Sequence, residues 1–158
     1  MKRSLKFSTR LTVIIFVWLM SFNTLNAQWI QTNGPCGGTV QCFLAVSGTN
    51  LFAGTLLDGV YLSTNNGTSW TAVNSGFSKN YNVANVHSLA VSGTNLFAGT
   101  GGGVYLSTNN GTSWDSVNTG LTNTYVSALA VSGTNLFAGT AGGGVFLSTN
   151  NGTSGDSV

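Results

Sequence analysis

The sequence predicts an all-β chain built from three similar units, and two observations predict it. The segment LAVSGTNLFAGT occurs unchanged at 44–55, 89–100 and 129–140, so the copies start 45 and 40 residues apart. An interval of this size fits either propeller blades or paired-helix repeats. The units are rich in Val, Thr, Phe, Tyr and Trp and are interrupted by short segments of Gly and Asn, which is typical of strands separated by turns. The composition therefore favours blades.

Each unit divides into four expected strands, which in the second unit are 86–92, 95–100, 103–108 and 113–118. The first three have apolar residues on both faces, as the neighbours Leu89 and Ala90 illustrate. A sheet that is apolar on both faces needs a neighbour on each side, and blades packed face to face provide it. We therefore predict a β-propeller of four-stranded antiparallel blades, here about three blades that form an open, incomplete propeller.

The N-terminal segment 1–27 has the order of a secretory signal peptide: basic residues, an apolar run at 11–20 and a small residue, Ala27. We expect cleavage after Ala27. The alternative is an uncleaved membrane anchor, for which the run is shorter than the ~20 apolar residues of a spanning helix. The expected location is secreted, periplasmic or at the cell surface, without membrane contact once the signal is removed.

The exported part begins with a segment, 28–39, that we expect to form an outer closure strand and a loop. Its letters WIQTNG resemble the fourth strand of the first unit, WTAVNSG. Three blades are expected at 40–75, 85–119 and 125–158, and the last stops early in its outer strand. We therefore expect these residues to belong to a longer protein whose remaining blades cover them. The isolated segment is expected to form an open arc that self-associates or remains partly unfolded.

The charge of the exported part excludes some partners. From residue 28 onward Lys79 stands against Asp58, Asp115 and Asp156, which gives a formal charge of −2, and this part contains no Arg and no Glu. No basic surface remains for nucleic acid.

The cysteines are Cys36 and Cys42, both in the exported part. Pairing depends on a Cα distance that sequence does not show, so a disulfide and two free thiols both remain open. With the single distant His87, these thiols fall short of a zinc ligand set. We expect no metal and no cofactor.

The turn STNNGTS follows the expected third strand of every unit. Its spacing resembles the Asp-box of the BNR repeat family, with Asn in place of Asp. The family includes sialidases, sortilin-type receptors, some xyloglucan-degrading hydrolases and a photosystem II assembly factor. The resemblance implies a propeller in which the box joins the third and fourth strands. The matching positions are Ser63, Asn65, Gly67 and Trp70; Ser107, Asn109, Gly111 and Trp114; and Ser148, Asn150 and Gly152, with Gly155 where the third Trp would stand.

Physical chemistry assigns these residues a structural role. Ser and Asn oxygens accept hydrogen bonds from nearby backbone N–H groups, Gly adopts positive φ and Trp covers the base of the turn. Asn-Gly favours a two-residue hairpin turn. The turn lacks the carboxylates of a calcium site. Its NGT also matches the N-glycosylation acceptor, whose use depends on the source of the protein.

The sequence predicts no catalytic site. A sialidase of this family needs an arginine cluster and a Tyr–Glu pair, and the exported part has neither Arg nor Glu. We expect Asp58 in a loop and Asp115 and Asp156 in outer strands, too far apart for the ~10 Å or less of a hydrolytic carboxylate pair. His87 aligns with Cys42 and Ser127 and is interpreted as a strand-packed or edge-exposed residue, because a catalytic base would need an oriented partner.

Binding is the expected function, because the segments that join the blades vary. Phe77, Lys79, Tyr81 and Tyr125 lie in or beside them and suit contact with a sugar or a protein, although filling the seams between blades is the favoured interpretation of the aromatics. We predict an exported, non-catalytic binding or scaffold module. The alternatives are the N-terminal part of a larger sialidase-like or other glycoside hydrolase with catalytic residues beyond Val158, and a structural repeat of a cell-surface adhesin.

Overall fold

The computed structural model describes residues 29–35, 42–77, 85–152 and 156–157. The chain divides into two units, Met1–Ile30 and Gln31–Val158, and all strands lie in the second. Within the described ranges, no helix is long and apolar enough to cross a membrane. The expected signal peptide, Cys36, Lys79, Tyr81 and Gly155 lie outside these ranges, so the proposed disulfide does too.

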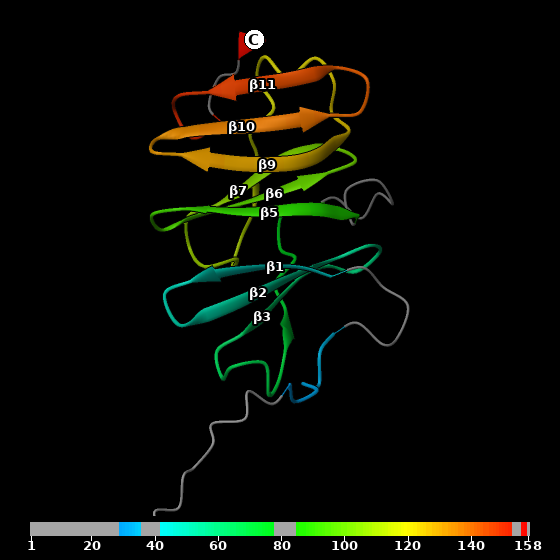
Figure 1. The fold of residues 1–158 in the computed structure, drawn as a ribbon, viewed down its shortest axis with the longest axis vertical. Helices are drawn as coiled ribbons and strands as arrows, with labels where there is room; N and C mark the ends of the chain where they lie inside the picture. The colour runs from blue at the N-terminus through cyan, green and yellow to red at the C-terminus, as the bar shows by residue number, and fades with distance from the viewer. Residues whose placement is uncertain (1–28, 36–41, 78–84, 153–155, 158) are drawn as a thin grey trace, which may run out of the picture. The chain divides into compact units, whose positions relative to one another are not determined.

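Three four-stranded antiparallel sheets follow one another along the chain (Figure 1). We call them blades 1, 2 and 3, and the predicted all-β architecture is confirmed. Blade 1 contains β1 (Cys42–Ser47), β2 (Asn50–Thr55), β3 (Gly59–Ser63) and β4 (Thr71–Ala72). Blade 2 contains β5 (Val86–Ser92), β6 (Asn95–Thr100), β7 (Gly103–Ser107) and β8 (Asp115–Ser116). Blade 3 contains β9 (Val126–Ser132), β10 (Asn135–Thr140), β11 (Gly144–Ser148) and β12 (Asp156–Ser157).

The first hairpin of each blade is closed by a two-residue Gly-Thr loop. Its glycines Gly48, Gly93 and Gly133 all have φ of 60°. The register that follows is the same in the three blades, with Ser47 opposite Asn50, Ser92 opposite Asn95 and Ser132 opposite Asn135. Identical letters therefore produce identical hairpins.

The hydrophobic cores lie in two seams between the blades. In the first seam, Phe52 and Val60 of blade 1 pack against Leu96 and Trp114 of blade 2, among others. In the second seam, the cluster holds Phe97, Val104, Val126, Leu136, Ala138 and Phe146, drawn from blades 2 and 3. Since full burial of such a side chain contributes ~1.5–3 kcal/mol, the stability of this fold resides in the seams.

Glycine in each second strand lets neighbouring blades approach closely. A Cβ atom added at Gly54 would lie 2.5 Å from Cγ1 of Val86 and 3.4 Å from Cδ1 of Leu89. At Gly99 it would lie 2.7 Å from Cγ1 of Val126 and 3.2 Å from Cγ of Leu129. Each of these glycines thus forms a notch that receives a Leu and a Val of the next blade.

The first strands of blades 2 and 3 carry an irregularity that blade 1 lacks. Between Val86 and Ser88 the register with β6 shifts, which leaves His87 without an opposite residue. The register with β10 shifts likewise at Ser127, whereas Cys42 pairs with Thr55 in unbroken register. A bulge redirects the side chain of its extra residue, and His87 stacks on Tyr125 at the start of β5.

Candidate functional site

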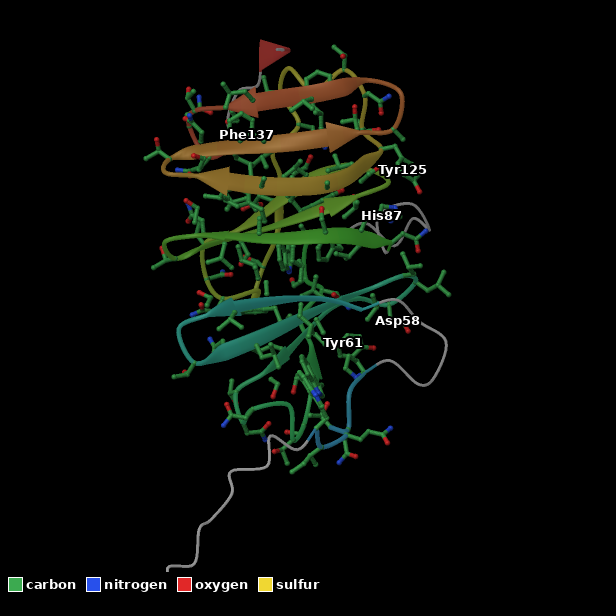
Figure 2. All side chains as sticks on the ribbon, in the orientation of Figure 1. Asp58, Tyr61, His87, Tyr125 and Phe137 are labelled. Atoms are coloured by element: carbon green, nitrogen blue, oxygen red, sulfur yellow. The ribbon has the colours of Figure 1, made fainter. Side chains whose placement is uncertain are left out.

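One end of the blades gathers the β2–β3, β6–β7 and β10–β11 loops with the segments that lead into β5 and β9. We call this end the loop face. Leu56 pairs with Asn85 in an isolated bridge, and Ala141 N donates to Tyr125 O over 2.9 Å. Figure 2 shows Asp58, His87 and Tyr125 at this same end of the three sheets. The loop face therefore runs continuously across both seams.

Side-chain hydrogen bonds hold the loops of this face. The Thr55 hydroxyl donates to Gly59 O over 2.9 Å and accepts from Asp58 N over 3.2 Å. Asn74 accepts from Val60 N over 2.7 Å and donates to Asp58 O over 2.8 Å. In blade 2, Asn118 makes the corresponding bonds to Val104 N (2.7 Å) and Gly102 O (3.2 Å). The backbone of these loops is thus fixed without any ligand.

The β2–β3 loop of blade 1 contains a strained residue. Leu57 has φ of 109° and a side chain that is 52% exposed. Blade 3 has Gly142, with φ of 83°, at the corresponding place in its loop. A non-glycine residue in such a conformation costs on the order of 1–3 kcal/mol, and such strain clusters at functional sites. Leu57 and its exposed neighbour Asp58 therefore mark this loop as a candidate contact point.

Beside the second seam, His87 and Tyr125 form a stacked pair. Their ring centroids are 4.9 Å apart and their planes are inclined by 29°. Tyr125 is 48% exposed and His87 is half-buried, and this burial lowers the pKa of His87 below 6.5. The buried atoms His87 Nε2, Asn85 Oδ1 and Ser88 Oγ have no hydrogen-bond partner among the residues that the structure describes, which do not include the preceding segment 78–84. Unsatisfied buried polar atoms are rare in native proteins, so their concentration at the start of β5 distinguishes this part of the loop face.

Of the residues predicted to contact a ligand, the structure describes Phe77 and Tyr125, and these two are not brought together. Phe77 lies in the core of the first seam, with its ring centroid 4.9 Å from those of both Tyr105 and Trp114. Tyr125 lies on the loop face. Phe77 thus fills the first seam, whereas Tyr125 is exposed. The strained Leu57 and the bulged His87 were not expected from the sequence, because both depend on backbone geometry that the letters do not encode.

The opposite end of the blades carries the repeated turn. In blade 1, Thr68 N donates to Asn65 O over 3.2 Å, and the two central residues Asn66 and Gly67 have φ of 54° and 82°. Positive φ at both central residues defines a type I′ turn. Seven residues separate β3 from β4 and β7 from β8, whereas the predicted strands 103–108 and 113–118 left four. The Asn-Gly turn therefore lies inside a longer connection than predicted.

The side chains of the repeated turn form the same network three times. Ser63 Oγ accepts from Gly67 N and donates to Asn65 Oδ1, both over 2.9 Å, and Asn65 Oδ1 also accepts from Ser69 N over 2.9 Å. The corresponding bonds in blade 2 join Ser107, Asn109, Gly111 and Ser113. In blade 3, Ser148 Oγ accepts from Gly152 N over 2.7 Å and donates to Asn150 Oδ1 over 2.9 Å. Because Ser113 is held in its turn, β8 is shorter than the predicted 113–118.

The two tryptophans of the turns are placed differently. Trp70 is half-buried, and its Nε1 donates to Gly67 O of its own turn over 3.2 Å. Trp114 is 2% exposed, and its Nε1 donates to Val73 O of blade 1 over 2.7 Å. Trp114 thus does more than cover its own turn, because it also joins blade 2 to blade 1 across the first seam.

At the corresponding place in the second seam lies an apolar pocket. Its walls include Val117, Leu121 and Gly152, which stand where Val73, Phe77 and Gly111 stand in the first seam. Leu136, Ala138 and Phe146 of blade 3 complete it, as Leu96, Ala98 and Tyr105 surround Trp114. The pocket therefore corresponds to the site of the Trp114 side chain.

The catalytic possibilities of the described carboxylates are limited. Asp58 belongs to the loop face. Asp115 pairs with Leu106 near the end of β7 that leads into the repeated turn. These two side chains therefore lie toward opposite ends of the blades. Among the residues that the structure describes, no group of three His, Cys, Asp or Glu is able to hold a metal ion.

No family model matches the sequence, and no curated protein matches it. Solved structures do. An ancestral GH74 enzyme is 25% identical with a TM-score of 0.62, over 82% of this chain and 19% of that one. The GH74 enzyme of Niastella koreensis is 24% identical (TM-score 0.59, 84% and 20%), and YCF48 from Cyanidioschyzon merolae is 14% identical (TM-score 0.59, 77% and 38%). The fold is that of a β-propeller. This propeller chain spans about a fifth of the length of the GH74 enzymes it matches.

Proposed function

We propose that this chain is an exported, non-catalytic propeller module of the Asp-box type that binds a partner through its loop face. The repeated turn supports the Asp-box assignment. Asn65 Oδ1 accepts hydrogen bonds from Ser63 Oγ and Ser69 N, which needs an acceptor oxygen but no negative charge. Asn thus performs the structural task for which the family uses Asp.

The observation that carries the binding role is the loop face itself. It combines loops fixed by hydrogen bonds, an exposed and strained Leu57 beside Asp58, and the half-exposed Tyr125. Preformed backbone with a few projecting apolar and polar groups is what a recognition surface requires, because little entropy is lost when it binds. Exposed tyrosine suits stacking on a sugar ring or insertion into a protein pocket.

The non-catalytic assignment rests on the residue inventory and on placement. The chain after residue 27 has no Arg and no Glu. Asp58 and Asp115 lie toward opposite ends of the blades, and a hydrolytic pair needs its carboxylates within ~10 Å.

A second function is supported by the comparisons. The chain resembles GH74 enzymes at 24–25% identity and spans about a fifth of their length. It would then be the N-terminal part of a glycoside hydrolase, with catalytic residues outside these 158 positions. Reading the coding sequence beyond Val158 distinguishes the two: blades with further carboxylates and arginines support the hydrolase.

The binding role is tested by calorimetric titration of the exported chain with β-glucan oligosaccharides and sialosides, and by assaying the same mixtures for hydrolysis. We expect binding without turnover. Tyr125→Ala should weaken binding by roughly 10-fold or more, as loss of an aromatic anchor does. Asp115→Asn, at the other end of the blade, is the matched control and should bind normally. Turnover that disappears in Asp58→Asn would disprove the non-catalytic assignment.

Export has its own measurement. Mass spectrometry of the secreted material should show Gln28 or Trp29 as the first residue. An intact Met1 in the exported fraction would contradict cleavage.

A further inference from the structure

Among the residues that the structure describes, the outward faces of blades 1 and 3 contact no other blade, and each repeats a face that does. The outward face of blade 3 carries Phe137 and Val145, where blade 2 carries Phe97 and Val104 in the second seam. Phe97 is 0% and Val104 3% exposed, whereas Val145 is 50% exposed.

The outward face of blade 1 has the complementary character. It carries Leu44 and Val46, each 63% exposed, where blade 2 carries Leu89 and Val91 packed into the first seam. The two unpartnered faces are thus the two halves of a seam that this chain already makes twice.

The glycine notch gives the register of that missing seam. Gly54 and Gly99 each receive a Leu of the next blade, Leu89 and Leu129. Gly139 is the third such glycine, and a Cβ atom there would meet only Ala128 of its own blade, at 3.7 Å. Leu44 corresponds to Leu89 and Leu129, so it is the side chain that fits the vacant notch.

The segment before blade 1 gives a second, independent indication. Gly111 and Gly152 of the repeated turns lie against Val73 and Val117 from the outer edge of the preceding blade. Gly67 of blade 1 lies against Thr32, with its added Cβ 3.1 Å from Cγ2 of Thr32. Residues 29–32 align with 70–73 and 114–117, so Thr32 stands where the outer strand of a preceding blade would place it.

We infer that a second copy of this chain docks head-to-tail, with the outward face of its blade 3 on the outward face of blade 1, and that Trp29 of the first copy enters the apolar pocket of the second. Trp29 is 99% exposed and aligns with Trp114, whose site the pocket repeats. The donated residues Ile30 and Gln31 then replace Asp156 and Ser157 of β12 opposite Leu147 and Phe146, so docking requires β12 to leave the edge of β11. This inference does not depend on the binding role proposed above.

Two copies satisfy both faces of each other. Each copy has one notch, one pocket and one Trp29, and together they bring six blades, within the 4–8 of closed propellers. Further copies would exceed that range, so we expect a particle of two copies and not an open series.

The experiment is analytical ultracentrifugation of the exported full chain over a range of concentrations. We expect the mass of two copies, together with a shift of tryptophan emission to shorter wavelength as Trp29 becomes buried. Trp29→Ala should weaken association by about 30-fold or more, as loss of a buried interface Trp does. Gly139→Val, at a position where an added Cβ atom meets nothing closer than Ala128 Cβ at 3.7 Å, should fill the notch and weaken association by about 10-fold or more. Asp115→Asn, at an exposed position of β8 in blade 2, is the control and should leave the mass unchanged.

A mixture distinguishes head-to-tail docking from a symmetric contact. Trp29→Ala spoils one half of the seam and Gly139→Val the other, so a mixed pair retains one intact seam and should associate more tightly than either variant alone. A monomeric wild-type chain, a particle that grows without limit, an unchanged Trp29→Ala particle, or a mixture that gains nothing would each overturn the inference. If Gly139→Val fails to fold, it is replaced by Leu44→Asp, a change at an exposed residue on the blade 1 side of the seam. The mixture is then made from Leu44→Asp and Val145→Asp, which alter the two opposite sides of the seam.

Discussion

Blade 2 and blade 3 have nearly the same strands but different surroundings. β6 and β10 share the letters NLFAGT, yet five of the six residues of β6 are buried and only two of those of β10. All residues of β5 are at least half-buried, whereas several residues of β9 are exposed. Since the residues are the same, the difference comes from the neighbours: blade 2 has one on each side and blade 3 has one.

The comparison locates the stability of the fold in the contacts between repeats, as in other repeat proteins. The contribution of a side chain to the free energy of unfolding therefore depends on how deeply its seam buries it. Equivalent substitutions in two blades should have unequal effects.

The largest difference is expected for the paired phenylalanines. Phe97→Ala removes a fully buried ring from the second seam and should lower the free energy of unfolding by ~3–5 kcal/mol. Phe137→Ala affects a half-buried ring on the outward face of blade 3 and should cost less than half as much. Urea unfolding of both variants, at a concentration where wild type is a single copy, measures the two values. Equal losses would show that burial in the seam does not set the cost.

Substitutions of Trp114 and Trp70 are expected to change the free energy of unfolding by an intermediate amount, and again by different amounts in the two blades. Trp114→Phe removes the Nε1 donor and leaves the Val73 carbonyl without its partner, which should cost ~1–3 kcal/mol. Trp70→Phe loses a 3.2 Å bond inside its own half-buried turn, and we expect ~1 kcal/mol or less. Thermal melts of the two variants test the order. A larger loss for Trp70 would contradict the view that Trp114 locks the first seam.

A substitution in the β2–β3 loop of blade 1 is expected to stabilise the chain, and the reciprocal substitution in the β10–β11 loop of blade 3 is expected to destabilise it. Leu57→Gly should raise the free energy of unfolding by about 1 kcal/mol, because glycine relieves the strain at φ of 109°. Gly142→Leu, the reciprocal change in blade 3, should lower it by a similar amount. If Leu57→Gly destabilises the chain instead, packing by this leucine outweighs its strain.

The smallest expected effect concerns the bulged position, which holds His87 in blade 2 and Ser127 in blade 3. Burial lowers the pKa of His87 below 6.5, so the unfolded chain takes up the proton first as the pH falls. Stability should therefore be complete above pH 6.5 and decrease as the pH falls from 6.5 toward the pKa of the folded state. His87→Ser, which copies blade 3, should remove this slope. NMR titration of the imidazole checks the direction, and a pKa above 6.5 would refute it.

The sequence predicted what is local and repeated. Strand positions follow from β-propensity and turn letters, and positive φ at Gly67 follows from the absence of a Cβ atom. The length of the connection around Asn66, the strain at Leu57 and the bulge at His87 were not predicted, because each is set by hydrogen bonds or packing from another strand. The reach of Trp114 to Val73 spans 41 residues of sequence, and nothing in the letters of its turn specifies that distance.

The pocket in the second seam also depends on long-range packing that the sequence alone does not reveal. The loss of the third Trp was visible in the sequence, but its meaning was not. The placement of Val117, Leu121 and Gly152 shows that these residues line a pocket, and this pocket corresponds to the site of Trp114 in the first seam.

The Gly-Thr loops of the first hairpins solve a problem that identical repeats create during folding. Three copies of one strand sequence offer the chain many pairings of equal strength, and a strand of one blade matches the partner strand of another letter for letter. Contact between residues three positions apart, such as Ser47 and Asn50, forms far sooner than contact between residues 40 or more apart, because the entropy of closing a loop rises with its length. Gly48, Gly93 and Gly133 favour the tight reversal, so each hairpin closes on itself before a copy competes for it. Lengthening one of these loops with flexible residues should therefore slow folding and populate cross-paired species, even where the final structure is unchanged.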